Sequence, residues 1–200
     1  MESYDLQSVA ELLAGEYVVN SNRSVCVIVK SELYQRKKEN NIMFRTIRKK
    51  KNEISIDTAK ALLQSSRRGV LAVNGDDGYP YAIPINYVYD DDAQKIYFHG
   101  ARAGHKVDAL RACDKVCFTV YGNETIKEED WAPFVQSVVV FGRCHLVESS
   151  ARATTLLKRF AMKYYPSEQL VDEEIAYAGK AVQIFEIDVE YLSGKEIQER

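Results

Sequence analysis

The stretch from residue 69 to residue 100, GVLAVNGDDGYPYAIPINYVYDDDAQKIYFHG, constrains the fold more than any other part of the sequence. Apolar and polar side chains alternate along it, which is typical of strands that bury one face. The alternation is interrupted at NGDDG and at DDDAQ, and both interruptions are typical of hairpin turns. The stretch therefore predicts three short antiparallel strands in succession.

The rest of the sequence extends this pattern into a mainly β fold. Three later segments also alternate and predict three more strands: KVCFTVYG, QSVVVFGRCHLVE and AVQIFEIDVEYLSG. Short antiparallel strands with few, small helices are typical of a closed or nearly closed barrel. We therefore expect a mainly β fold with some α structure, namely a six-stranded antiparallel barrel with flanking helices.

Four helices are expected around this barrel because apolar residues recur there at helical spacing. The predicted ranges are residues 55–68, 105–113, 150–165 and 172–180. Asp57 is the predicted N-cap of the first helix, and Gly69 is its predicted C-terminal stop. The third helix is expected to end at Pro166, and its apolar side is predicted to hold Leu156, Leu157, Phe160 and Met162.

Length and charge narrow the roles open to the chain. Its 200 residues fit one domain, and a net charge of −2 gives no basic field to attract nucleic acid or an anionic membrane. The sequence contains no run of about 18 apolar residues and no pattern of a secretory signal, so we expect a cytoplasmic protein. The cysteines lack paired metal-ligand spacing, and motifs of Rossmann sites, P-loops, zincins and serine hydrolases are absent.

Residues 1–42 differ from the rest of the chain, which we assign to a barrel domain at residues 43–200. Two interpretations stay open. In one, translation starts naturally at Met43. The Lys-Lys-Glu upstream of it can be encoded by codons that contain the purine run of a bacterial ribosome-binding site. In the other, residues 1–42 are a genuine N-terminal extension that packs on the barrel.

The stretch KIYFHGARAGHKVDALR, residues 95–111, combines a strand, a glycine-containing loop and the start of a helix. The first N–H groups of a helix have no intrahelical partner, so together with the helix dipole they attract anions. His105 and Lys106 fall in that first turn, where both could contact a bound phosphate. The alternative is that Lys106 is a solvated surface residue and that Gly100 and Gly104 only make a turn.

The preceding strand, YAIPINYVY, carries Pro84 in its middle. Proline cannot donate to a ladder, so it belongs on an edge or at a bulge, and a bulge beside a ligand can redirect backbone groups toward it. Asn86 then offers both a donor and an acceptor, which the pyrimidine edge of a flavin requires. The alternative is an ordinary edge strand without a ligand.

Four segments together resemble the FMN-binding split-barrel family, which includes pyridoxamine 5′-phosphate oxidase. They are MFRTIRKKKNEI, RRGVLAVNGDDGYPYAIPINYVY, KIYFHGARAGHKVDALR and SVVVFGRCHLVE. The resemblance covers residues 43–197 and is greater to the bacterial nitroimidazole-resistance (Nim-type) proteins than to the oxidase. It implies a six-stranded split barrel that forms a homodimer with FMN at the interface.

The resemblance also implies the residues of the cofactor site. These are Ile83, Pro84, Ile85, Asn86, Tyr87, Phe98, His99, His105, Lys106 and Ser137. The oxidase has an arginine and a lysine where this chain has Ile83 and Val88, and His105 replaces an arginine that grips the phosphate. The C-terminal tryptophan and arginine of the oxidase have no match here, which argues against pyridoxamine phosphate as the substrate.

The resemblance implies an FMN-dependent oxidoreductase. NAD(P)H would be a transient electron donor, and a nitro-aromatic or quinone-like small molecule would be the acceptor. The alternatives are a non-catalytic FMN- or haem-binding protein and a structural dimer with an empty cleft. No catalytic residue is assigned: His99 is either a proton donor or only a hydrogen-bond partner of FMN. His145 is interpreted as structural, and Trp131 as a packing residue that could instead cover the site.

Overall fold

The computed structural model describes residues 44–127 and 132–198. The two interpretations of residues 1–42 and the role of Trp131 lie outside these described residues. The range Thr46–Arg200 forms one compact unit. None of the helices in the described part of the chain is long and apolar enough to cross a membrane.

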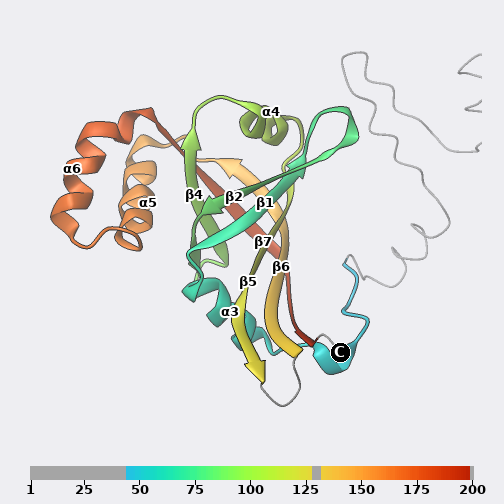
Figure 1. The fold of residues 1–200 in the computed structure, drawn as a ribbon. Coiled ribbons are helices and arrows are strands. Elements are labelled where there is room, and N and C mark those ends of the chain that lie inside the picture. The colour runs from blue at the N-terminus through green and yellow to red at the C-terminus, as the bar shows by residue number, and fades with distance from the viewer. Residues whose placement is uncertain (1–43, 128–131, 199–200) are drawn as a thin grey trace, which may run out of the picture. The chain divides into compact units, whose positions relative to one another are not determined.

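Seven antiparallel strands form one sheet in the order β2–β1–β5–β6–β7–β4–β3 (Figure 1). Their bounds are β1 (Arg68–Asn74), β2 (Pro80–Asn86), β3 (Val88–Asp90), β4 (Lys95–Ala101), β5 (Lys115–Lys127), β6 (Ala132–Leu146) and β7 (Val182–Gln198). The edge strands β2 and β3 are separated in the chain by Tyr87 alone, so the sheet must curl to bring its edges together. This is a split barrel with flanking helices, as predicted.

The strand count differs from the prediction for one reason. The segment that the sequence presents as one strand is divided at Tyr87 into β2 and β3, which pair with different neighbours. The first part pairs with β1 and the second with β4, so six predicted strands become seven. The sheet is therefore not closed by a continuous ladder of backbone hydrogen bonds.

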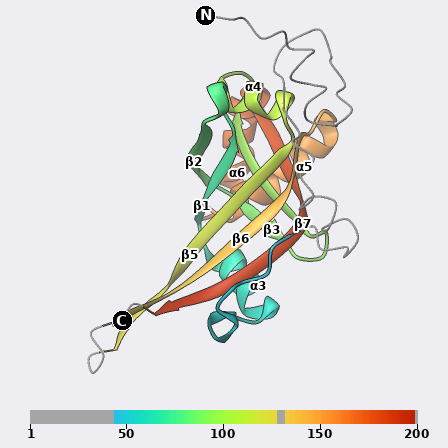
Figure 2. The ribbon, with the colours of Figure 1, turned by 90° about the vertical axis from the view of Figure 1, so that its right-hand side faces the viewer.

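The barrel core is apolar and includes residues of two helices, α3 (Ile56–Ser65) and α4 (His105–Ala112). Alternate residues of β1 are buried, and Leu71 and Phe118 from neighbouring strands are fully enclosed. Helix α3 (Ile56–Ser65) buries Ala59, Leu62 and Leu63 in the same cluster and packs on β5, β6 and β7. Figure 2 shows α3 against the part of these three strands that runs on beyond the rest of the sheet.

The ends of α3 differ from the prediction. Ser55 is the N-cap, since its side chain accepts a hydrogen bond from the Thr58 N–H, whereas Asp57 lies in the first turn. The helix ends at Ser65 because Ser66 already has extended backbone angles. Gly69 does not end the helix as predicted; it belongs to β1 and faces the ring of Phe118.

Two helices cover the side of the sheet next to β4 (Figure 1). They are α5 (Ser150–Met162) and α6 (Glu168–Ala178), so the predicted short helix near residue 172 is present but longer. An ion pair between Arg159 of α5 and the buried Asp90 of β3 ties α5 to the sheet edge. The predicted apolar side of α5 is right for Leu156 and Phe160 but wrong for Met162, which is 46% exposed.

The remaining elements are short. Helix α4 (His105–Ala112) follows β4 as predicted and buries Val107 and Leu110. Three 3-10 turns complete the described chain: η1 (Lys50–Asn52), η2 (Asp76–Gly78) and η3 (Gly179–Ala181). The turn η2 joins β1 to β2, which places it at the predicted NGDDG hairpin.

Candidate functional site

Strand β2 is held in place by the residue at which it ends. Tyr87 leaves the ladder, and its backbone N–H donates to the hydroxyl oxygen of Tyr164 at 2.8 Å. Its own side chain is fully buried, and its hydroxyl donates to the Leu63 carbonyl of α3 at 2.7 Å. Because a buried backbone group needs a partner, these bonds fix the end of β2 beside α3 and α5.

A cavity of about 590 Å³ lies along β2. This volume is in the range of small-molecule sites. Its walls come from β1, β2, β4 and α4, which the curled sheet brings together. Six of the ten predicted site residues line it: Ile83, Pro84, Ile85, Asn86, His99 and Lys106.

Lys106 is one of two cationic side chains that line this cavity, the other being Arg68. Its ammonium lies 5.3 Å and 5.1 Å from the ring centres of Phe98 and Phe185. Partial burial among these apolar groups is the main cause that lowers the pKa of Lys106. No carboxylate of the described residues lies within ion-pair distance of it. An unpaired cation in a cavity wall favours an anionic ligand.

Two glycines shape the loop before Lys106. A Cβ atom on Gly100 would lie 2.6 Å from the Lys106 ammonium, so a larger residue there would displace the end of this flexible side chain from its present position. Gly104 precedes α4 with φ of 118°, a conformation that L side chains rarely adopt. No side chain caps the start of α4. The loop therefore leaves the first turn of α4 accessible beside the lysine.

His99 lies at the end of β4 between two hollows. It lines the large cavity and also a narrow apolar pocket of about 90 Å³ beneath α5 and α6. Its ring meets that of Phe160 edge to face at 4.6 Å. Partial burial, followed by the charge of Lys106, lowers the pKa of His99, so the imidazole is neutral at pH 7. It can then both donate and accept a hydrogen bond.

The structure directs His105 away from Lys106. The imidazole stacks on Tyr81 with ring centres 4.1 Å apart, and its Nε2 lies 3.5 Å from a carboxylate oxygen of Asp76. His105 is therefore engaged by the β1–β2 hairpin and is absent from the cavity lining. Its predicted hydrogen bond to a phosphate stays a prediction, since the imidazole already has these neighbours.

The other three predicted residues do not line the cavity either. Phe98 is fully buried beneath Lys106 and stacks on Phe185, so it supports the lysine from below. Tyr87 is a core residue that holds the end of β2. Ser137 lies on β6 opposite Tyr121 and Lys195, and it borders neither large cavity of the described residues.

Sequence reasoning missed Arg68, the first residue of β1. Its Nε donates to the side-chain oxygen of Asn86 at 3.2 Å, so it orients the predicted polar residue of β2. Arg68 also lines the cavity and lies opposite Asn86 in the ladder. The sequence did offer one signal. Two consecutive arginines stand immediately before the predicted first strand, where helical spacing changes to alternation.

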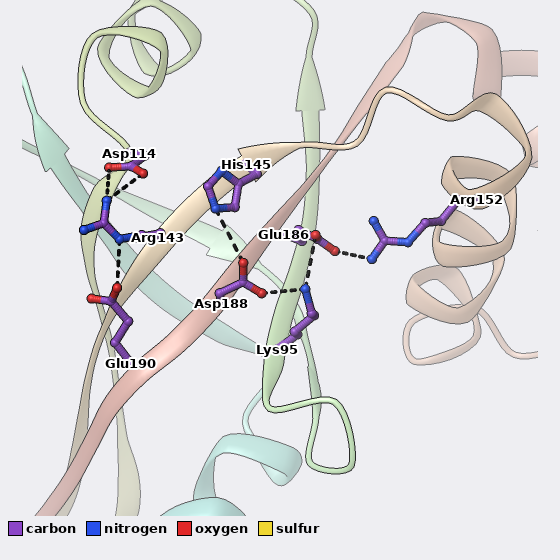
Figure 3. Close-up of polar contacts among 8 residues, drawn as sticks. All are labelled: Lys95, Asp114, Arg143, His145, Arg152, Glu186, Asp188 and Glu190. Atoms are coloured by element: carbon purple, nitrogen blue, oxygen red, sulfur yellow. Dashed lines mark hydrogen bonds and ion pairs between the residues drawn. The ribbon is translucent and has the colours of Figure 1, made fainter.

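Figure 3 shows a charge network made by residues that do not line the cavity. Lys95 contacts Glu186 and Asp188, Arg152 of α5 pairs with Glu186, and His145 Nε2 lies 3.5 Å from Asp188. The network ties β4, β6, β7 and α5 together. His145 therefore has a structural neighbour and does not border either large cavity of the described chain.

The sequence matches the model of one protein family across most of this unit. The family is described as pyridoxamine 5′-phosphate oxidase, and the match covers residues 55–196. The chain belongs to this family. A comparison with curated proteins gives no match.

Solved structures show the same fold at low sequence identity. A protein from Bacteroides thetaiotaomicron described as a candidate for 5-nitroimidazole antibiotic resistance is 17% identical, with a TM-score of 0.61 over 73% of this chain and 87% of that one. A flavocytochrome from Azotobacter vinelandii is 20% identical, with a TM-score of 0.63 over 78% and 73%. An FAD-binding protein from Mesorhizobium loti is 22% identical, with a TM-score of 0.55 over 72% and 96%. The split-barrel fold is thus common to proteins of different described roles.

Proposed function

We propose that this family member is an FMN-dependent oxidoreductase that uses NADH or NADPH to reduce small acceptors, such as nitro-aromatic or quinone-like compounds. Two of the similar structures are described as flavin proteins and a third as a nitroimidazole-resistance protein, which supports the proposal. The observation that carries it is the unpaired ammonium of Lys106 in the wall of the cavity along β2. An anionic cofactor of about this size suits that combination of charge and volume.

Several groups in the cavity walls would suit a flavin mononucleotide. Lys106 would hold the phosphate by charge, with the start of α4 beside it. Asn86, oriented by Arg68, would bind polar edge atoms of the ring. The strip from Ile83 to Ile85 would lie along the ring, with the exposed Pro84 facing the ligand and Ile85 packed in the core.

FMN, when bound, would supply the redox chemistry by accepting a hydride and passing electrons on to an acceptor. The residues of the chain bind and orient. His99, neutral at pH 7, is placed to donate a hydrogen bond to a ligand group in the cavity without adding a second positive charge next to Lys106. The narrow pocket beside it is apolar and is in contact with the same imidazole, so a small acceptor could lie there.

A homodimer with the flavin at its interface forms part of the proposal. The cavity is open to solvent along β2, the edge strand of the sheet, and a partner subunit would close it. Tyr79, immediately before β2, is a large exposed aromatic side chain beside this edge, with 76% of its surface exposed. Sedimentation of the purified protein with and without FMN measures the assembly directly.

The test is the visible spectrum of the freshly purified protein, with the released ligand identified by mass. A flavin spectrum with FMN released is expected, and anaerobic NADH or NADPH should then bleach it within the time of mixing. A protein that neither contains nor takes up FMN would refute the proposal.

The remaining candidate is a flavin- or haem-binding protein without turnover. One similar structure is described as a flavocytochrome, and the neutral imidazole of His99 in the cavity wall is of the kind that binds haem iron. Haemin titration tests it: a saturable Soret band with one haem per chain favours this candidate, provided that neither nicotinamide nucleotide reduces the protein.

A further inference from the structure

A second cavity opens where the sheet splits between β1 and β5. The ladder joining these strands is short and ends at the pair Val70 and Thr119, although β1 starts two residues earlier and β5 continues to Lys127. Beyond that pair the two strands no longer hydrogen-bond to each other. The space between them is a cavity of about 430 Å³.

This second cavity adjoins the first. Arg68 and Pro84 line both, so they form the boundary between them. Its other lining residues come from the segment before β1, from the start of β1 and from β5. A ligand in the second cavity would therefore lie next to the strip of β2 along which the flavin is proposed to bind.

Two arginines make the second cavity strongly basic. Arg67 lies with its guanidinium carbon 5.1 Å from the ring centre of Tyr164, and Arg68 uses Nε to bind Asn86. Neither forms an ion pair with a carboxylate of the described residues. Arginine presents five N–H donors in a fork that fits phosphate oxygens, and most of these donors remain available here.

The same cavity carries an aromatic surface. Tyr121 of β5 borders it and is 73% exposed, which is unusual for a tyrosine in the middle of a strand. Thr119 is a further polar neighbour, but its hydroxyl donates to the Val138 carbonyl within the sheet. Free guanidinium groups beside an exposed aromatic ring match a ligand that has both phosphates and planar rings.

We infer that this second cavity binds the phosphate groups of the nicotinamide nucleotide that donates electrons, with Arg67 as the main anchor and Arg68 shared with the flavin site. The inference rests on the proposed function, because it assigns a site to the electron donor. A phosphate held by Arg67 would leave the nucleotide's nicotinamide free to reach the adjoining cavity across Arg68 and Pro84. Tyr121 would contact a planar ring of the nucleotide.

Arg67 gives the cleaner test because it borders only the second cavity. Isothermal titration with NADP⁺, which cannot reduce the protein, measures binding without turnover, on the protein with and without added FMN. The variant Arg67→Ala is expected to weaken NADP⁺ binding about 10-fold and to leave FMN affinity within about twofold. Arg67→Lys keeps the charge but loses the forked guanidinium, so its NADP⁺ affinity should lie between that of the parent protein and that of Arg67→Ala.

Arg48→Ala is the matched control. It removes the same charge from an exposed arginine that borders neither cavity, and it should change neither affinity. In steady-state assays, Arg67→Ala should raise KM for NADPH with kcat nearly unchanged, which is the pattern of lost ground-state binding.

Three outcomes would overturn the inference. NADP⁺ affinity could be equal in the parent protein and Arg67→Ala, FMN affinity could fall instead, or Arg67→Ala could change the oligomeric state in sedimentation. A fall in FMN affinity would assign Arg67 to the flavin phosphate. A change of oligomeric state would assign Arg67 to a subunit interface. A protein that takes up no FMN but binds NADP⁺ through Arg67 would refute the proposed function and leave the nucleotide site intact.

Discussion

The hydroxyl oxygen of Tyr164 accepts a hydrogen bond from the backbone N–H of Tyr87 at 2.8 Å, across 77 residues of sequence. The same oxygen lies 2.7 Å from the Tyr87 carbonyl and 2.6 Å from the Arg67 carbonyl, and its single hydrogen can be donated to one of them. Tyr87 is the point where one edge of the sheet becomes the other. A single side chain therefore satisfies the backbone at the place where the barrel is split.

The substitution Tyr164→Phe should lower the free energy of unfolding by about 1–3 kcal/mol, because it leaves buried backbone groups of Tyr87 without a partner. Urea denaturation measures the change. Tyr165→Phe is the control: that residue is 39% exposed, and its substitution should cost less than about 0.5 kcal/mol. Equal effects of the two substitutions would contradict the role of the Tyr164 hydroxyl.

Lys106→Met should weaken FMN binding by about 1.5–3 kcal/mol, because it removes the charge that would hold the phosphate. Methionine keeps the apolar stem that packs on Phe98 and Phe185, so the fold should be preserved. Equilibrium dialysis with FMN measures the affinity. Lys115→Met, at an exposed position outside the cavity, is the control, and a loss of affinity no larger than that of the control would remove Lys106 from the site.

Much of the fold could be predicted because alternation and helical spacing are local properties. The strands at residues 69–100 and the helix after His105 follow from them directly. The division at Tyr87 could not be predicted, because nothing in the local pattern distinguishes it from any other buried strand residue. At Tyr87 the backbone N–H bonds to the hydroxyl of Tyr164, a contact that exists only once the end of α5 has packed on the sheet.

The part of the candidate site that could be predicted lies within one stretch of the sequence, residues 83–106. Ile83 to Asn86, His99 and Lys106 meet in the cavity because β2, β4 and α4 are close in sequence and in space. Arg68 was missed, since its role depends on lying opposite Asn86 in a ladder. His105 was predicted to join Lys106 on a phosphate from its place in the first turn of the helix and from the family resemblance. That contact stays a prediction, and in the structure the imidazole of His105 stacks on Tyr81.

The titration of His99 should depend on Lys106. The pKa of His99 is lowered first by partial burial and second by the charge of Lys106. The substitution Lys106→Met removes the second cause, so the midpoint of the His99 ring signal in an NMR titration should move upward toward about 6.5. Lys115→Met should leave that midpoint in place. An unchanged midpoint in Lys106→Met would mean that the two side chains are not neighbours in solution.

Lys163 is a second half-buried cation, located where α5 meets the end of β2. Its ammonium donates to the Ser66 carbonyl at 2.6 Å and lies 4.6 Å from the ring centre of Tyr87. Burial, followed by the charge of Arg67, lowers the pKa of Lys163 to about 8. In the unfolded chain the pKa of this lysine should be about 10.4. Between about pH 8 and about pH 10.4 the unfolded state therefore binds more protons than the folded state.

The sign of the resulting pH effect follows from this difference. The cost of burying the charged lysine is fully present below about pH 8, and stability is regained as pH rises from about 8 to about 10.4. The free energy of unfolding of the parent protein, minus that of Lys163→Met, should therefore rise with pH in this window. The gain should stay below about 1.4 kcal/mol per pH unit, because solvent reaches part of the side chain.

Lys158 of α5 is the matched control, because the pH dependence of stability expected for it has the opposite sign. Its ion pairs with Asp172 and Glu168 raise the pKa of Lys158, so its contribution should be present at neutral pH and should fade above its unfolded pKa. Urea unfolding of the parent protein, Lys163→Met and Lys158→Met over the same pH series measures both. A flat difference for Lys163→Met would mean that Lys163 is solvated and that the end of α5 is not packed against Tyr87 in solution. A difference that falls with pH would mean that its charge is stabilised, which would contradict the lowered pKa.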